Sequence, residues 1–178
     1  MKGTNKSEVR QTFRKGRAKT MKEQYRLQII DLLTTAYWME IETITNYVAN
    51  SVHLDGVRAE QIKKELAADV ASELMHAQSL VKRIKEIGGP VPGSMAFKAN
   101  QRSLQPPADT TDVVAVIKGV IDAENGAIEH YGKLIELSGE AHDYVTQDLC
   151  ITSLGDEEAH RTTFMGYLRE YPHESLTR

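Results

Sequence analysis

Cysteine is almost absent from this chain: Cys150 is the only one in 178 residues. A single thiol excludes an internal disulfide and any zinc site built from several cysteines. No apolar run approaches the roughly 20 residues that cross a bilayer, so no membrane contact is expected. The N-terminus lacks the apolar core of a secretory signal. These absences predict one globular domain in a reducing, cytoplasmic compartment, with Cys150 a small core residue.

Charge is distributed unevenly along the chain. Residues 1–26 hold nine Lys/Arg and two Glu, a balance of +7, so the overall charge of −3 leaves −10 for the remainder. We therefore expect a basic, flexible arm over 1–24, a folded body over 25–171 and a short tail over 172–178. A basic arm can contact DNA or the acidic surface of another subunit, or remain a solvated tail, and the sequence leaves these alternatives open.

The body shows helical periodicity throughout and no convincing strand. Apolar residues recur at steps of three and four in four segments, which indicates four amphipathic helices. The expected breaks are Asp55-Gly56, Gly88-Gly89-Pro90 and Ser138-Gly139, and Pro172 ends the fourth helix. A loop of about twenty residues follows the second break, and Asp109 to Asp112 offer caps for the third helix. The pattern predicts an all-α four-helix bundle of two antiparallel hairpins joined by one long crossover.

Each apolar stripe is interrupted at one height by acidic residues and histidines. These residues are Glu40, Glu73, His76, Glu124, Glu157 and His160. Within each hairpin the two glutamates have the same separation and straddle the predicted turn symmetrically. Residues equidistant from the turn of an antiparallel hairpin lie at the same height, so the six side chains should meet inside the bundle.

The second hairpin repeats the first with one constant offset in the numbering. The offset takes Glu40 to Glu124, Tyr47 to Tyr131, Glu73 to Glu157 and His76 to His160. In each Glu-x-x-His pair the two side chains share a helix face and offer an oxygen and a nitrogen to one ion. Burying four carboxylates without counter-charge is costly, and two divalent cations would supply that charge. Carboxylate and imidazole ligands suit iron or manganese and do not choose between them.

These residues resemble the ferritin superfamily, in particular bacterioferritin and the Dps-like proteins that carry a bacterioferritin-type site. The resemblance covers roughly residues 25–171. Its motifs are Glu40, Glu73-Leu-Met-His76, Glu124 and Asp156-Glu157-Glu-Ala-His160.

The resemblance also implies roles for these residues. Glu73 and Glu157 would bridge two iron ions, with Glu40 and His76 as terminal ligands of one ion, and Glu124 and His160 of the other. Tyr47 and Tyr131, two helical turns after Glu40 and Glu124, would lie beside the centre as hydrogen-bond partners or electron donors; packing in the core is the alternative.

The sequence departs from bacterioferritin in ways that bear on cofactor and assembly. Leu74 occupies the position of the haem-ligating methionine and Met75 follows one residue later, so no haem of that kind is expected. Only eighteen residues follow His160, too few for a fifth helix, and the crossover is long. Both features favour a dodecameric Dps-like cage over a 24-mer. The cysteine pair found in many Dps-like relatives is missing.

The predicted function is therefore that of a ferroxidase in a homo-oligomeric cage. It would oxidise Fe(II) with O₂ or H₂O₂ for iron storage and protection against oxidative stress. Two alternatives remain: a protein that condenses DNA through residues 1–26, and a di-metal redox enzyme similar to manganese catalase.

Three further acidic residues bear on the site. Asp69 lies one turn before Glu73 and could bond a ligand or line a path for iron. Asp156 precedes the second Glu-x-x-His, whereas Ser72 precedes the first, so an outer carboxylate is predicted on one side only. Glu42 is expected at the surface.

Overall fold

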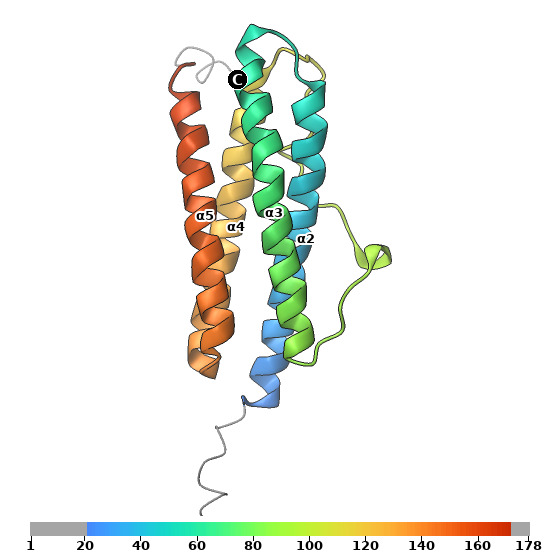
Figure 1. The fold of residues 1–178 in the computed structure, drawn as a ribbon, viewed down its shortest axis with the longest axis vertical. Helices are drawn as coiled ribbons and strands as arrows, with labels where there is room; N and C mark the ends of the chain where they lie inside the picture. Colours follow the sequence, from blue (N-terminus) through green and yellow to red (C-terminus); the bar gives the residue numbers. More distant parts are fainter. Residues whose placement is uncertain (1–20, 172–178) are drawn as a thin grey trace, which may run out of the picture.

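The computed structural model describes residues 21–171, which form the predicted all-α bundle. Helix α2 (Glu23–His53) and helix α3 (Glu60–Glu86) make the first hairpin, and helix α4 (Val113–Ala141) and helix α5 (Tyr144–Leu168) make the second. A one-turn 3-10 helix, η1 (Val57–Ala59), leads into α3, and another, η2 (Ser94–Ala96), lies within the crossover. Figure 1 shows the four long helices running side by side along the long axis.

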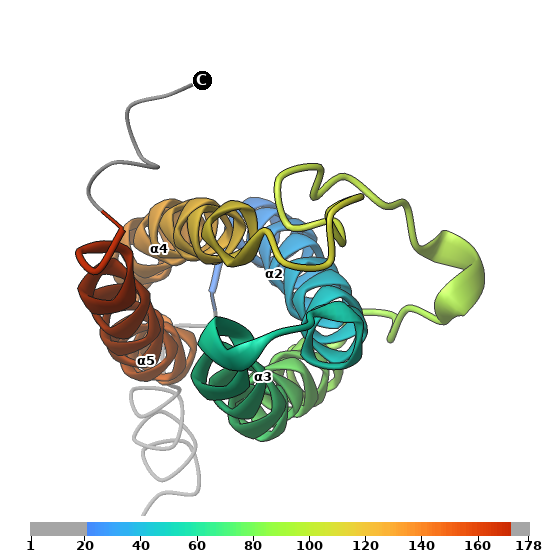
Figure 2. The same ribbon diagram turned by 90° about the horizontal axis from the view of Figure 1, so that it is seen from above.

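The helices occupy the corners of a quadrilateral around a common axis (Figure 2). Helices α2 and α4 lie along one side and α3 and α5 along the other, and the η2 turn projects away from the bundle. None of the helices in residues 21–171 is long and apolar enough to cross a membrane. Most of the predicted basic arm lies outside these residues. Arg26, two residues after the predicted arm, belongs to α2 and donates hydrogen bonds to the carbonyl oxygens of Ile87 and Gly88.

The interior consists of two apolar clusters separated by a polar band. One cluster includes Leu66, Ile117 and Phe164, and the other includes Leu33, Leu80 and Leu134, all fully buried. Cys150 is a buried, free thiol in the second cluster, as predicted. The apolar clusters hold the helices together on both sides of the polar band, which fixes the spacing of the side chains within it.

The turn of the second hairpin lies a few residues later than predicted. Ser138 and Gly139 remain helical, and their carbonyl oxygens accept hydrogen bonds from Asp143 and His142. His142 adopts the left-handed conformation with φ of 57°, and the Asp143 side chain caps α5 by accepting from the Thr146 amide. One glycine in a helix costs only about 1 kcal/mol, so the cap at Asp143 decides where the helices end.

The prediction that Glu42 is a surface carboxylate was wrong. Its carboxylate is buried under the crossover and accepts hydrogen bonds from the backbone amides of Asn100 and Gln101 at 2.7 to 3.0 Å. The Asn50 side chain likewise donates to the Leu104 carbonyl. These bonds fasten the crossover to α2, so a helix face that looked solvated in the sequence is an internal surface.

The crossover also packs closely on α4 at Gly119. A Cβ atom there would lie 2.5 Å from the Ser103 carbonyl oxygen and 3.0 Å from the Leu104 Cα. Both atoms belong to the backbone, so the crossover would have to move away. We expect Gly119→Ala to lower the free energy of unfolding by about 1–3 kcal/mol, despite the higher helix propensity of alanine. Urea denaturation of the two proteins measures this difference.

Gly132, on the same helix, provides the matched control. A Cβ atom there meets nothing within 4 Å. Gly132→Ala should therefore raise stability by up to about 1 kcal/mol through helix propensity alone. Equal effects of the two substitutions would contradict the close approach of the crossover at Gly119.

Candidate metal centre

Six side chains from four helices converge at the middle of the bundle. Helix α2 contributes Glu40, α3 contributes Glu73 and His76, α4 contributes Glu124, and α5 contributes Glu157 and His160. All four glutamates and His76 are buried, and His160 is nearly so. They face inward because each lies on the apolar stripe of its helix, where positions three and four residues apart share a face.

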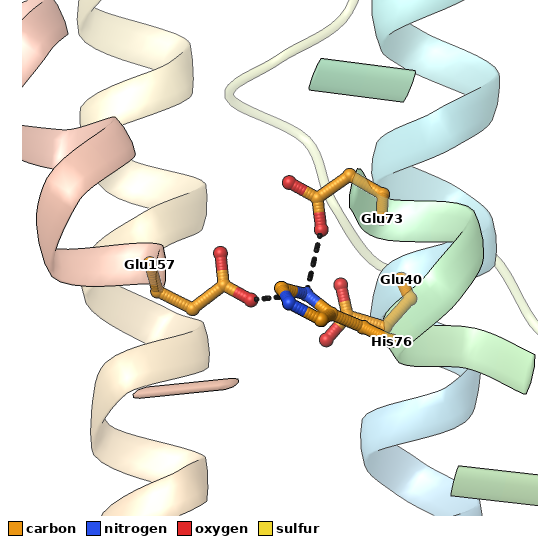
Figure 3. Close-up of side chains that lie close together, drawn as sticks. All are labelled: Glu40, Glu73, His76 and Glu157. Atoms are coloured by element: carbon orange, nitrogen blue, oxygen red, sulfur yellow. Dashed lines mark ion pairs between the residues drawn. The ribbon is translucent and has the colours of Figure 1, made fainter. Parts of the chain in front are cut away.

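The first group comprises Glu40, Glu73, His76 and Glu157. One ligand atom from each lies within 4.8 Å of the others. The His76 Nδ1 atom is 3.1 Å from Glu157 Oε1 and 3.5 Å from Glu73 Oε2 (Figure 3). In this view the carboxylates of Glu73 and Glu157 point toward the imidazole from opposite sides of the bundle, with Glu40 behind it.

The second group comprises Glu73, Glu124, Glu157 and His160, again with ligand atoms within 4.8 Å of one another. The His160 Nδ1 atom is 3.2 Å from Glu73 Oε1 and 3.5 Å from Glu157 Oε2. Within residues 21–171 these are the two groups whose geometry could hold a metal ion. They share Glu73 and Glu157, whose two oxygens face different histidines.

Two tyrosines support the terminal glutamates across the hairpins. The Tyr131 hydroxyl on α4 donates to Glu40 on α2, and the Tyr47 hydroxyl on α2 donates to Glu124 on α4. Burial, followed by the neighbouring carboxylates, raises the pKa of both phenols well above their ordinary value, so both remain donors. A tyrosine of each hairpin therefore orients the terminal glutamate of the other hairpin.

Several buried atoms at the centre have no hydrogen-bond partner. They are both carboxylate oxygens of Glu73, Oε1 of Glu157, and Nδ1 of His76 and of His160. Unsatisfied buried polar atoms are costly in a folded protein, and these five all belong to the two groups. Oxygen and imidazole-nitrogen donors suit a divalent transition metal, so the residues present fit a pair of such ions.

The shared glutamates and the histidines hold opposite charges. Burial opposes ionisation of Glu157, but the close contacts with His160 and His76 outweigh it and lower its pKa to about 2. The same two imidazoles lower the pKa of Glu73 against the effect of burial. Burial likewise opposes the charge on the histidines, but contacts with Glu157 and Glu73 raise the pKa of each to about 11.

The environment of the terminal glutamates favours their neutral form. Burial and then the charge of Glu157 raise the pKa of Glu40 well above its ordinary value. Burial and the contact with Glu157 raise the pKa of Glu124 to about 10. Two carboxylates, two imidazolium groups and two neutral carboxyls give the metal-free centre no net charge, which is how the bundle tolerates so many buried ionisable groups.

Outside the two groups, each histidine faces one more acidic residue. The His76 Nε2 atom is 3.1 Å from Asp156 Oδ2, as the position of Asp156 in the sequence indicated. The His160 Nε2 atom is 3.9 Å from Asp69 Oδ1. The sequence identified Asp69 as a candidate but gave no reason to pair it with His160, because that contact joins α3 to α5. His53 and His130 instead contact the backbone carbonyls of Pro107 and Leu32.

A four-helix bundle with a long crossover and a central carboxylate–histidine cluster defines the class of ferritin-like proteins. A family model described as the ferritin-like domain matches residues 30–173, and the chain belongs to this family. The chain is 25% identical to a bacterioferritin from Desulfovibrio desulfuricans over 143 residues, which cover 80% of this chain and 75% of the relative. It is 27% identical to a DNA protection during starvation protein from Pyrococcus furiosus over 148 residues, which cover 82% of this chain and 79% of that relative.

Solved structures share the fold. A dodecameric thioferritin, the bacterioferritin-related protein of Bacteroides fragilis, superposes with a TM-score of 0.70 at 22% identity, covering 86% of this chain and 92% of that one. A ferritin-like di-iron-carboxylate protein of Bacillus anthracis superposes with a TM-score of 0.73 at 19% identity, covering 83% of this chain and 99% of that one. The chain therefore belongs with the ferritin, bacterioferritin and Dps-like proteins of iron storage, as its motifs predicted.

The protonation of the metal-free centre makes metal binding release protons. Two ions held by four ionised carboxylates and two neutral imidazoles require the loss of one proton each from Glu40, Glu124, His76 and His160. We expect about four protons per chain, or about two per ion, at pH 7. Titrating the metal-free protein with Zn(II) in weakly buffered solution, with a pH indicator, measures the release. Affinity should fall as the pH falls, because protons compete for the same atoms.

The variant Glu73→Ala/Glu157→Ala serves as the control because it lacks the carboxylates common to both groups. It should bind little Zn(II) and release few protons. Stoichiometric binding by the wild type with almost no proton release would contradict the charge state derived for the metal-free centre.

Proposed function

We propose that this chain is a ferroxidase of an iron-storing cage and oxidises Fe(II) at a di-iron centre. The ligands in this proposal are Glu40, Glu73, His76, Glu124, Glu157 and His160. The observation that carries the proposal is the pair of four-residue groups that share Glu73 and Glu157. Shared carboxylates would hold two ions close together, where both could react with one oxidant molecule.

Fe(II) is the substrate, and O₂ or H₂O₂ is the oxidant. Two Fe(II) ions supply one electron each, so one H₂O₂ and two protons yield two Fe(III) and two water molecules. The protein contributes a donor set of matching charge that is buried between two apolar clusters.

The chain's own residues then hold that donor set in place. Tyr131 and Tyr47 orient the carboxyls of Glu40 and Glu124 from the opposite hairpin. Asp156 contacts the outer nitrogen of His76 and leaves Nδ1 directed at the centre. A preorganised site of this kind needs little rearrangement when charge changes on the ions.

Manganese is the alternative metal, since its ligand preferences overlap with those of iron. The relatives named bacterioferritin and thioferritin favour iron. A manganese-loaded protein that evolves O₂ rapidly from peroxide, with little activity when loaded with iron, would instead support a catalase-like enzyme.

We expect the metal-free protein to bind two Fe(II) per chain anaerobically and to oxidise them rapidly when O₂ or H₂O₂ is added. Anaerobic titration followed by stopped-flow absorbance of Fe(III) measures both steps. Glu73→Ala/Glu157→Ala should lose stoichiometric binding and slow the oxidation by at least about 100-fold, because each glutamate serves both ions.

Glu129→Ala/Glu158→Ala provides a control that removes two exposed glutamates of the same charge. It should oxidise Fe(II) at the wild-type rate. Equal oxidation by the wild type and the Glu73/Glu157 variant would show that the six residues do not form an iron site.

We further propose that the cage is a dodecamer. The shared fold with the dodecameric thioferritin of Bacteroides fragilis supports this assembly. Each chain has a mass of 19.9 kDa, so a dodecamer has twelve times that mass and a 24-mer has twice the mass of the dodecamer. Sedimentation velocity should show the smaller particle at micromolar concentration. A 24-mer, or a monomer that still oxidises Fe(II), would contradict the proposal.

A further inference from the structure

The centre has two halves, one around Glu40 and His76 and the other around Glu124 and His160. The two halves match closely only in these inner residues. The constant offset between the hairpins relates the glutamates, tyrosines and histidines, but it relates Asp156 to Ser72. Asp156 lies 3.1 Å from the outer nitrogen of His76. In the described structure, Ser72 makes no such hydrogen bond to His160. The sequence repeat therefore places an outer carboxylate beside His76 and no matching carboxylate beside His160.

Asp69 is the nearest replacement. It lies one turn before Glu73 on α3, with a side chain 13% exposed, and its Oδ1 atom is 3.9 Å from His160 Nε2. That distance exceeds the roughly 2.7–3.2 Å of an N–H···O hydrogen bond. Its other oxygen, Oδ2, is buried and has no hydrogen-bond partner. A largely buried carboxylate thus stands within one small side-chain movement of the imidazole, and that movement would bring Oδ1 to hydrogen-bonding distance of Nε2.

We propose that Asp69 is the positioning residue for His160, and that the two halves of the centre consequently fill in order. The inference rests on the proposed function, because it requires a two-ion centre. The His76 half fills first, since Asp156 already fixes its imidazole. The His160 half fills second and more weakly, because Asp69 must first close the gap of 3.9 Å. An outer carboxylate fixes both the tautomer and the ring orientation of a ligating histidine.

Anaerobic titration of the full-length, metal-free protein with Co(II) tests this order. Co(II) bound by carboxylates and imidazole absorbs visible light, so the absorbance counts the bound ions independently of any enzymatic activity, and the variants below assign each binding step to one half. The wild type should show two resolved steps of one ion each. Asp69→Asn should weaken the second step by about 10–100-fold and leave the first unchanged, and Asp156→Asn should weaken the first.

A rescue experiment separates positioning from mere folding. Position 72 corresponds to Asp156 under the offset, so Ser72→Asp in the Asp69→Asn background should restore the second step. Asp148→Asn, which changes an exposed aspartate on α5, should leave both steps as in the wild type. Thermal unfolding followed by circular dichroism establishes that each variant is folded. A folded Asp69→Asn protein with both steps intact, or a folded double variant without rescue, would overturn the proposal.

The same titration distinguishes this inference from the proposed function. If Glu73→Ala/Glu157→Ala binds Co(II) as the wild type does, the centre does not exist and both proposals fail. If the wild type binds two ions at that centre in one step and Asp69→Asn changes nothing, only the order of filling fails.

Discussion

The structure depends on how the bundle tolerates four buried carboxylates at its middle. Charges of one sign packed this closely in a low-dielectric interior would repel one another strongly. The metal-free centre avoids this by holding two imidazolium groups between two ionised glutamates and by keeping the other two carboxyls neutral. Protons therefore balance the carboxylate charge that two divalent ions would otherwise balance. The centre can thus have no net charge both without metal and with two ions bound.

This requirement shapes the packing around the centre. The apolar interior divides into one cluster containing Leu66 and another containing Leu80, and the ionisable band lies between them. The clusters hold the helices, while the band links the hairpins through the Tyr131–Glu40 and Tyr47–Glu124 contacts. Near one end of the bundle, Arg83 on α3 bonds the Asp143 cap of α5, which adds a further link between the hairpins. The geometry of the centre thus rests on contacts that lie along much of the bundle.

The sequence predicted the four helices and the meeting of the six inner residues because both follow from helical periodicity. A residue on the inward stripe of a regular helix has a height and a direction that spacing alone determines, as Glu40 and Glu73 show. The burial of Glu42 could not be predicted in this way. It depends on where an irregular crossover lies, and the amides of Asn100 and Gln101 carry no periodic signal. The turn at His142 was misplaced for a similar reason: a cap at Asp143 outweighed the weak break at Gly139.

The limits of periodicity also explain why a symmetric sequence forms an unequal centre. The constant offset between the hairpins preserves the glutamates, histidines and tyrosines of the centre, and a change at the ionisable ones would leave a buried charge unbalanced. The outer position of Asp156 is partly solvated and is not repeated in the other hairpin: its side chain is 52% exposed, and its counterpart under the offset is Ser72. Asp69 reaches the same imidazole from a different turn of α3 and at a different distance. Two ions held by equivalent inner residues would therefore differ in the carboxylates behind their histidines, so outer contacts rather than ligand identity would distinguish the two halves.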